Sequence, residues 1–155
     1  ENTALVRAAM SDSARLIANL DAAARLLRSR PGATGKVATI GWCFGGGVAL
    51  SYGVGGAHHE GTAMFYGRLL QDPAVLARMH HPLYGSFAGQ DRGIPPDSVR
   101  KFVEALRAAG ISNDVHIYDE VGHGFWLWVD RDPAHATAPA LDAWQRLKTY
   151  LATVL

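Results

Sequence analysis

The sequence has a single cysteine, almost no net charge and no long apolar run, and each shortage excludes a class of protein. One cysteine cannot form a disulfide within the chain, and it suits a reducing compartment. A net charge of +1, with lysine and arginine spread over 155 residues, leaves no electrostatic footprint for nucleic acid or for an anionic membrane surface. No apolar run approaches the roughly 20 residues that a membrane-spanning helix needs.

The beginning of the sequence shows no basic region followed by an apolar core, so no signal peptide is visible and a cytoplasmic location is expected. A leader that had been removed would leave no trace. A chain of 155 residues is long enough to bury a core, and neither repeats nor linkers interrupt it. We therefore expect one domain over residues 1–155.

The cysteine lies in the most informative segment, Gly41–Gly47, which reads GWCFGGG. An apolar run at 36–40 precedes this segment, and a helix-like run follows it. The order predicts a strand, a sharp turn with Cys43 at its apex and a helix, which is the pattern of a nucleophile elbow. Such a turn strains the backbone of the nucleophile, so small residues are expected on either side of it. The thiol would then lie near a helix N-terminus, where the dipole favours a thiolate and a developing oxyanion.

Two further residues follow later apolar runs. Asp91 comes just after the run that starts at 82, and His123 comes just after the alternating run at 115–118. Nucleophile, acid and then histidine is the chain order of the α/β-hydrolases. Open parallel sheets place their sites at the carboxyl ends of strands, where these residues are expected. The histidine would act as base towards Cys43, and the aspartate would fix its tautomer.

Strand and helix patterns alternate along the chain after a helical start. Residues 4–30 have apolar side chains at helical spacing, and Ser11 or Asp12 is placed to cap a helix. Alternating strands and helices imply a parallel sheet with crossovers, so the predicted fold class is α/β. The expected strands are about 36–41, 60–66, 82–88 and 113–119, and the expected helices about 44–53, 72–79, 96–109 and 138–154.

With these residues in place, the sequence resembles the dienelactone hydrolase family, a cysteine branch of the α/β-hydrolases. The resemblance runs from residue 37 to the C-terminal helix and rests on four motifs: Gly41–Gly46, Phe65–Gly67, Gly89–Pro95 and Tyr118–Phe125. It implies an α/β-hydrolase-like parallel sheet flanked by helices, a small-molecule ester or lactone as substrate, and neither cofactor nor metal. It also implies Cys43 as nucleophile, His123 as base and Asp91 as the acid that orients the histidine.

In this family further strands precede the elbow, and the elbow strand is central in the sheet. Without such strands, residues Val37–Ile40 would form a bare apolar edge, which is a template for pairing. We therefore expect a sheet that lacks its N-terminal strands: part of a longer chain, a domain completed by another chain, or an edge-paired or swapped oligomer. By resemblance, the backbone N–H of Phe44 is one oxyanion donor and a loop between the earlier strands supplies the second. Losing one such donor typically costs about 10²–10³ in rate.

The chemistry of a thioester acyl-enzyme limits the substrate. A thiolate leaves more readily than an alkoxide, so forward reaction needs a good leaving group, as in an enol lactone or an activated ester. Well-known family members carry an arginine four residues after the histidine, where this sequence has Leu127, and the change favours a less anionic or larger substrate. The candidate pocket residues are Trp42, Tyr66, Arg68, Arg92, Phe125 and Trp126.

Other interpretations of the same residues stay open. Cys43 could be a buried small apolar residue, as free cysteines often are, or a redox thiol. The glycines do not follow the G-x-G-x-x-G spacing of a dinucleotide site, and the histidines lack metal-ligand spacing. The main rival to a hydrolase is a non-catalytic or incomplete hydrolase-like module that needs a missing N-terminal segment or a partner.

Overall fold

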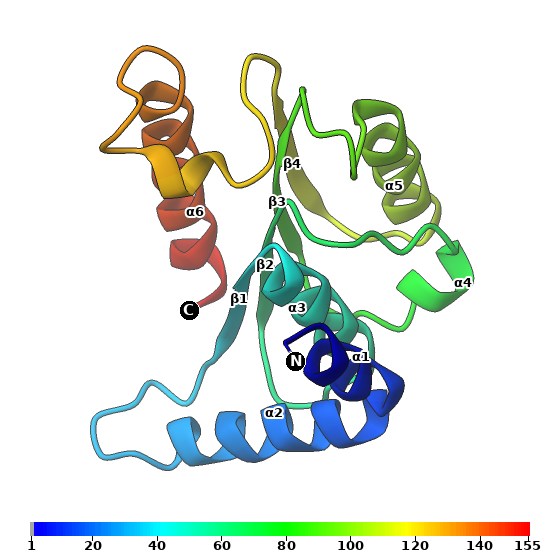
Figure 1. Ribbon diagram of the computed structural model, residues 1–155. Helices are drawn as coiled ribbons and strands as arrows, with labels where there is room; N and C mark the ends of the chain where they lie inside the picture. Colours follow the sequence, from blue (N-terminus) through cyan, green and yellow to red (C-terminus); the bar gives the residue numbers. More distant parts are fainter. Residues whose placement is uncertain (1) are drawn as a thin grey trace.

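Four parallel strands form the centre of the fold in the computed structural model, which describes residues 2–155 (Figure 1). Their order in the sheet follows the sequence, β1-β2-β3-β4, and every neighbouring pair is parallel. The predicted parallel α/β fold is therefore confirmed. The strands are β1 (Ala38–Trp42), β2 (Gly61–Phe65), β3 (Leu83–Ala88) and β4 (Asn113–Tyr118).

Helices lie between and around the strands, and two of them begin or end at residues whose chemistry favours it. The Asp12 side chain caps α2 by accepting a hydrogen bond from the backbone N–H of Arg15 at 3.0 Å, so the helical segment 4–30 divides there. Gly110 follows α5 with a φ of 74°, a conformation that suits glycine at a helix end. The helices are α1 (Asn2–Ser11), α2 (Ser13–Arg28), α3 (Phe44–Gly55), α4 (Pro73–Leu76), α5 (Pro96–Ala108) and α6 (Thr137–Val154), with a 3-10 turn η1 (Phe125–Trp128).

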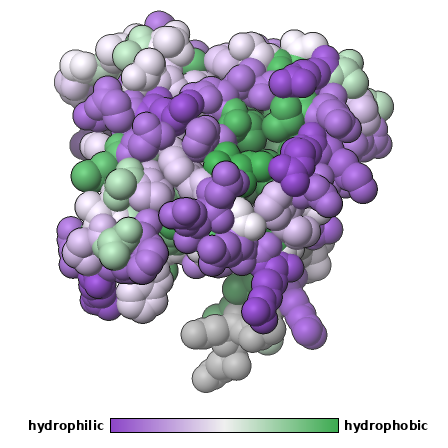
Figure 2. Space-filling view, turned by 90° about the horizontal axis from the view of Figure 1, so that it is seen from above, coloured by the Kyte–Doolittle hydropathy of each residue, from purple (hydrophilic) through white to green (hydrophobic). Residues whose placement is uncertain are grey.

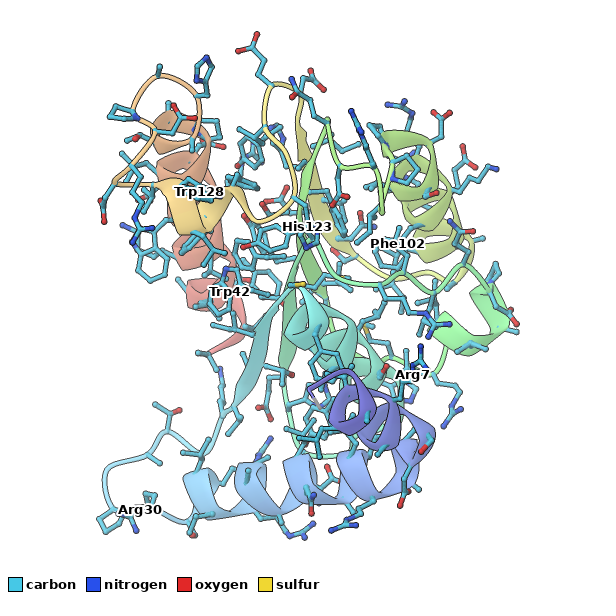
Figure 3. All side chains as sticks on the ribbon, in the orientation of Figure 1. Arg7, Arg30, Trp42, Phe102, His123 and Trp128 are labelled. Carbon is cyan, nitrogen blue, oxygen red and sulfur yellow. The ribbon has the colours of Figure 1, made fainter. Side chains whose placement is uncertain are left out.

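Both faces of the sheet are covered, which gives the fold three layers (Figure 1). Met64 and Phe87 pack with α3 and α5 on one face, where Phe102 of α5 is directed towards the sheet (Figure 3). Phe65 and Tyr84 pack with α6 on the other face. Because side chains alternate along a strand, a strand buried on both faces reads as a nearly continuous apolar run. Among the described helices, none combines the length and the apolar character needed to cross a membrane.

Strand β1 has a neighbouring strand on one side only and forms an edge of the sheet. Ile40 and Trp42, both in this strand, are each 38% exposed. The bare edge that was expected at this strand is therefore present in the described chain. Large apolar side chains in η1 and α6 are exposed as well: Leu127, Trp128, Leu141 and Trp144.

Two histidines are packed together at the amino ends of β2 and β3. The His59 ring stacks on Tyr52 with a centroid distance of 4.3 Å and meets the His81 ring edge-on at 4.3 Å. Both ring nitrogens of His59 are buried and have no hydrogen-bond partner among the described residues. Burial, reinforced by the neighbouring His81, lowers the pKa of His59 to about 4.

We expect acid to destabilise the fold through His59. In the unfolded chain the imidazole binds a proton near its ordinary pKa of 6.5, whereas in the folded chain it does so only near pH 4. The free energy of unfolding therefore falls as the pH drops from 6.5 towards 4, by at most about 1.4 kcal/mol per pH unit. The variant His59→Phe keeps a ring on Tyr52 and removes the titrating nitrogens. Urea denaturation at neutral pH and at about pH 5 should show the wild type losing up to about 2 kcal/mol relative to the variant. Equal losses in the two proteins would contradict the assignment.

Candidate active site

Cys43 lies in a strained turn between β1 and α3. Its backbone has a φ of 53° and a ψ of −118°. Among the described residues other than glycine, only Cys43 and Tyr66 have a positive φ. Most residues avoid this region because Cβ crowds the backbone, so its use is typical of functional turns. The predicted strand, turn and helix are present, and the thiol is exposed at the start of α3.

Glycines at this turn let the first turn of α3 approach the strand ends closely. A Cβ on Gly41 would lie 1.9 Å from the carbonyl oxygen of Gly45, and one on Gly46 would lie 2.8 Å from that of Phe65. The expectation that only small residues fit on either side of Cys43 is therefore confirmed at Gly41, and Gly46 is equally confined. At Gly45 the expectation is wrong. A Cβ on Gly45, in contrast, would have no neighbour within 4 Å. The first turn of α3 thus lies directly against the ends of β1 and β2.

The structure brings Cys43, His123 and Asp91 together in a hydrogen-bonded chain. Nε2 of His123 is 3.2 Å from Sγ of Cys43, and Nδ1 is 2.6 Å from Oδ2 of Asp91. The other carboxylate oxygen of Asp91 accepts hydrogen bonds from the backbone N–H groups of Gly93 at 2.8 Å and Ile94 at 3.1 Å. The Asp91 side chain is only 3% exposed, so its orientation is fixed on both oxygens. Figure 3 shows His123 near the end of β1 and the start of α3.

These contacts set the charge state that His123 favours. Partial burial by itself would lower the pKa of His123, but the hydrogen bonds to Cys43 and Asp91 and the charges of both raise it above its ordinary value. The imidazole is therefore a stronger base than a solvated one. A proton on Nδ1 is held by Asp91, which leaves Nε2 to exchange a proton with the thiol.

Two cavities border Cys43. The larger, of about 520 Å³, contains the exposed side chain of Arg68, which takes part in no ion pair among the described residues. The smaller, of about 310 Å³, is walled by Trp42, Trp126 and Leu127. Figure 2, the view from above Figure 1, shows a patch of apolar surface bordered by hydrophilic residues.

The remaining predicted pocket residues are placed differently. Arg92 is exposed and borders neither cavity. Phe125 is 2% exposed and packs in the core against Tyr66 and Tyr118. Phe44 is the first residue of α3, so its backbone N–H has no acceptor within the helix and remains available to an oxyanion beside Cys43.

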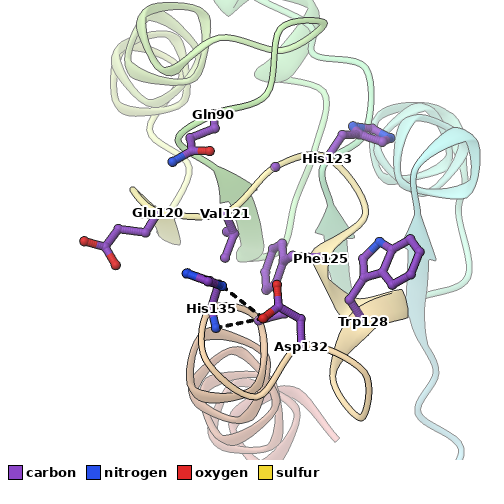
Figure 4. Close-up of a pocket in the computed structure, with 10 residues that line it drawn as sticks. Gln90, Glu120, Val121, His123, Phe125, Trp128, Asp132 and His135 are labelled. Carbon is purple, nitrogen blue, oxygen red and sulfur yellow. Dashed lines mark hydrogen bonds and ion pairs between the residues drawn. The ribbon is translucent and has the colours of Figure 1, made fainter.

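A third cavity, of about 430 Å³, touches His123 but not Cys43 (Figure 4). Across it from His123 lies a hydrogen-bonded pair in which Nδ1 of His135 is 3.0 Å from Oδ1 of Asp132. Since the thiol is absent from its wall, this cavity does not present a substrate to Cys43. Nowhere in the described chain do three or more histidine, cysteine, aspartate or glutamate side chains gather closely enough to hold a metal ion.

Sequence reasoning missed part of the wall of the larger cavity. Leu69 and Gln71 come from the loop after β2, Ile94 comes from the loop before α5, and Ser98 comes from the first turn of α5. Their positions just past the carboxyl ends of β2 and β3 were the available signal, because loops at that edge line the site in open parallel sheets. Their side chains carry no chemistry that would have singled them out.

Comparison with known sequences places this geometry in a family. The sequence model of the dienelactone hydrolase family matches residues 1–155. A Methylorubrum extorquens protein assigned as a carboxymethylenebutenolidase is 31% identical over 147 residues, which cover 88% of this chain and 50% of that protein. The carboxymethylenebutenolidase of Pseudomonas putida is 29% identical over 109 residues, which cover 70% of this chain and 46% of that protein.

Solved structures give the same result for the fold. A Klebsiella pneumoniae protein assigned as a dienelactone hydrolase has a TM-score of 0.78 and 25% identity, and the match covers 90% of this chain and 61% of that one. A dienelactone hydrolase-like promiscuous phosphotriesterase from metagenomic libraries has a TM-score of 0.83 at 19% identity, covering 98% and 66%, and shows the fold alone. The chain spans about half the length of the curated relatives it matches.

The glycine contact at the turn predicts a sharp difference between two neighbouring substitutions. Gly41→Ala would push a methyl group into the backbone of Gly45, so we expect it to destabilise the fold by about 3 kcal/mol or more. Gly45→Ala meets no atom and should be neutral or stabilise α3 by up to about 1 kcal/mol. Urea denaturation followed by circular dichroism measures both, and similar effects from the two variants would contradict the close approach.

Proposed function

This chain belongs to the dienelactone hydrolase family, and from that premise we propose that it hydrolyses carboxylic esters or lactones through Cys43. The observation that supports this function most strongly is the chain of contacts from Sγ of Cys43 to Nε2 of His123 at 3.2 Å and from Nδ1 to Asp91 at 2.6 Å. A nucleophile within reach of a base, which a third group orients, is the general arrangement of covalent catalysis.

In the proposed acylation, His123 takes the thiol proton on Nε2 and Sγ attacks the substrate carbonyl. The oxygen becomes an oxyanion beside the backbone N–H of Phe44 at the start of α3, where the helix dipole also favours negative charge. His123 then returns the proton to the departing oxygen, leaving a thioester on Cys43. Asp91 stabilises the imidazolium in between. Water, activated by the same histidine, hydrolyses the thioester.

The two cavities beside Cys43 indicate what the substrate carries. The walls of Trp42, Trp126 and Leu127 suit an apolar or aromatic group of moderate size. The larger cavity offers the unpaired guanidinium of Arg68 to a polar group. Leu127 occupies the position of the family's carboxylate-binding arginine, so the apolar end of the substrate is assigned to that side. A good leaving group is needed because a thiolate otherwise departs first.

The exposed edge of β1 supports a second proposal, that full activity needs a further strand against this edge. Ile40 and Trp42 are partly exposed there, and an unpaired strand edge readily pairs with another chain. The strand would come from a longer form of this chain or from a second copy. It would also bring the second oxyanion donor that the family takes from an earlier loop. A non-catalytic module is the alternative if neither form reacts.

Acylation of Cys43 is the direct test of the function. Mixing the chain with p-nitrophenyl acetate should release p-nitrophenolate in a burst of one equivalent per folded protein and add an acetyl group to Cys43, detected by mass spectrometry. Cys43→Ala should show neither, because no other described nucleophile is paired with a base at this site.

The same measurement on a longer form, with the preceding strands present, separates the two proposals. A burst in the longer form alone supports completion of the β1 edge. Acylation in neither form favours the non-catalytic module, and unchanged hydrolysis by Cys43→Ala would contradict the role of the thiol.

Asp91→Asn tests the orienting acid. We expect a loss of about 10⁴ in rate, because the amide no longer fixes the tautomer of His123. The acid limb of the pH–rate profile should move to lower pH, since Asp91 is one of the groups that raise the pKa of His123. Asp97→Asn is the matched control, because Asp97 is exposed and pairs only with Arg100. Equal rates for the Asp91 variant and the wild type would contradict the assignment of the acid.

A further inference from the structure

Three side chains border both cavities beside the thiol: Cys43, His123 and Tyr66. The first two are the proposed nucleophile and base. A substrate that reaches from one cavity to the other across Cys43 must therefore pass Tyr66 as well. Tyr66 therefore lies where the two cavities meet, as do the two proposed reacting groups.

The backbone of Tyr66 is held in an unfavourable conformation at this junction. Its φ is 36°, although a bulky side chain strongly disfavours a positive φ. The residue directly follows β2, and its N–H donates a hydrogen bond to the carbonyl of Ser86 at 2.7 Å. Its ring packs edge-on against the imidazole of His123 at a centroid distance of 5.0 Å. Strain of this kind is maintained mainly where function requires it.

The hydroxyl of Tyr66 differs from that of every other tyrosine in the chain. The other four tyrosine hydroxyls each donate to an oxygen of the protein: Tyr52 to Asp21, Tyr84 to Ala143, Tyr118 to Asp142 and Tyr150 to Pro82. The Tyr66 hydroxyl has no partner among the described residues. Tyr66 as a whole is only 2% exposed, but its hydroxyl is not among the fully buried polar atoms that lack a partner, so the oxygen keeps a small accessible surface.

The raised pKa of Tyr66 keeps this hydroxyl protonated, so that it can donate a hydrogen bond. Burial of the ring, reinforced by the charge of Cys43, raises the pKa of Tyr66 to about 12. The group therefore stays protonated at neutral pH and does not compete with His123 as a base. An accessible, protonated and unpaired hydroxyl beside a nucleophile is available to an oxygen of the bound substrate.

We propose that the Tyr66 hydroxyl donates a hydrogen bond to the leaving-group oxygen of the ester bound at Cys43, an inference that rests on the proposed function. The two oxygens of the ester have different neighbours. The carbonyl oxygen turns to the N–H of Phe44, whereas the leaving oxygen turns to Nε2 of His123, from which it takes a proton. Because the Tyr66 ring contacts His123, its hydroxyl belongs to the side from which the leaving group departs.

The hydrogen bond from Tyr66 acts on the breakdown of the tetrahedral intermediate. At this step a thiolate is expelled more readily than an alkoxide, so the forward reaction is disfavoured. Sγ forms a bond to the carbonyl carbon, and the electron pair of the C=O bond moves to oxygen. The intermediate can expel either the thiolate or the alkoxide. A hydrogen bond from Tyr66 lowers the basicity of the alkoxide oxygen as the C–O bond breaks and its electron pair stays on that oxygen. The oxygen then receives the proton of His123, while Tyr66 keeps its own.

The test compares Tyr66→Phe with the wild type on three acetate esters whose leaving groups differ in basicity: p-nitrophenyl, phenyl and 2,2,2-trifluoroethyl acetate. We expect the variant to acylate about 10–100-fold more slowly with the trifluoroethyl ester, the size expected for one hydrogen bond to a developing charge. With p-nitrophenyl acetate the change should be under about threefold, because that leaving group needs no assistance. The dependence of the rate on leaving-group pKa is therefore steeper in the variant.

Tyr84→Phe is the matched control. It removes a buried hydroxyl that is bonded to Ala143 at 2.8 Å and borders neither cavity, so it should lower the melting temperature without changing the leaving-group dependence. Tyr66→Phe should leave the melting temperature unchanged. Equal losses on all three esters, or no loss on any, overturn the inference while the proposed function stands. If neither this chain nor its longer form acylates Cys43 with any of the esters, the proposed function fails, and this inference fails with it.

Discussion

The glycine-rich first turn of α3 presses against the ends of β1 and β2, and the geometry of the whole site depends on that contact. Gly41 and Gly46 leave no room for a Cβ, so the strand and the helix approach until their backbones touch. The chain must then reverse direction at Cys43 with a φ of 53°. As a result the thiol stands clear of the sheet, next to the unpaired N–H groups at the helix start. The strain at one residue is maintained by packing at its neighbours.

The other two groups reach the thiol from strands that are not adjacent to β1. Asp91 follows β3 and His123 follows β4, at the far side of the sheet from Cys43. Neighbouring strands lie roughly 4.8 Å apart, so the loop after β4 must extend back over the ends of β3 and β2. Tyr66, at the end of β2, lies beneath His123 and supports the ring at this point. In the proposed mechanism, the strained backbone of Tyr66 keeps its ring against His123 and its hydroxyl beside the two cavities.

The sequence predicted the fold well because the central strands β2 and β3 are buried at every position and appear as runs without charged residues, while β4 shows an alternating pattern. The convergence of Cys43, Asp91 and His123 was also predictable, since parallel strands end at one edge of the sheet. The residues that form the walls of the cavities could not all be predicted from the sequence. Arg92 lies in the same loop as Asp91, yet its side chain points to solvent, and Phe125 packs into the core. Such outcomes depend on how loops pack in three dimensions, for which side-chain spacing along the chain carries no signal.

The central claim is that Asp91 acts only through His123 on Cys43. A double-mutant cycle tests it directly by measuring the acylation of Cys43 in the wild type, Asp91→Asn, His123→Ala and the double variant. We expect Asp91→Asn to slow acylation strongly when His123 is present but to cause no further loss once His123 is absent. If Asp91→Asn slowed both backgrounds by the same factor, the two residues would act independently and the proposed chain of contacts would not be the catalytic unit.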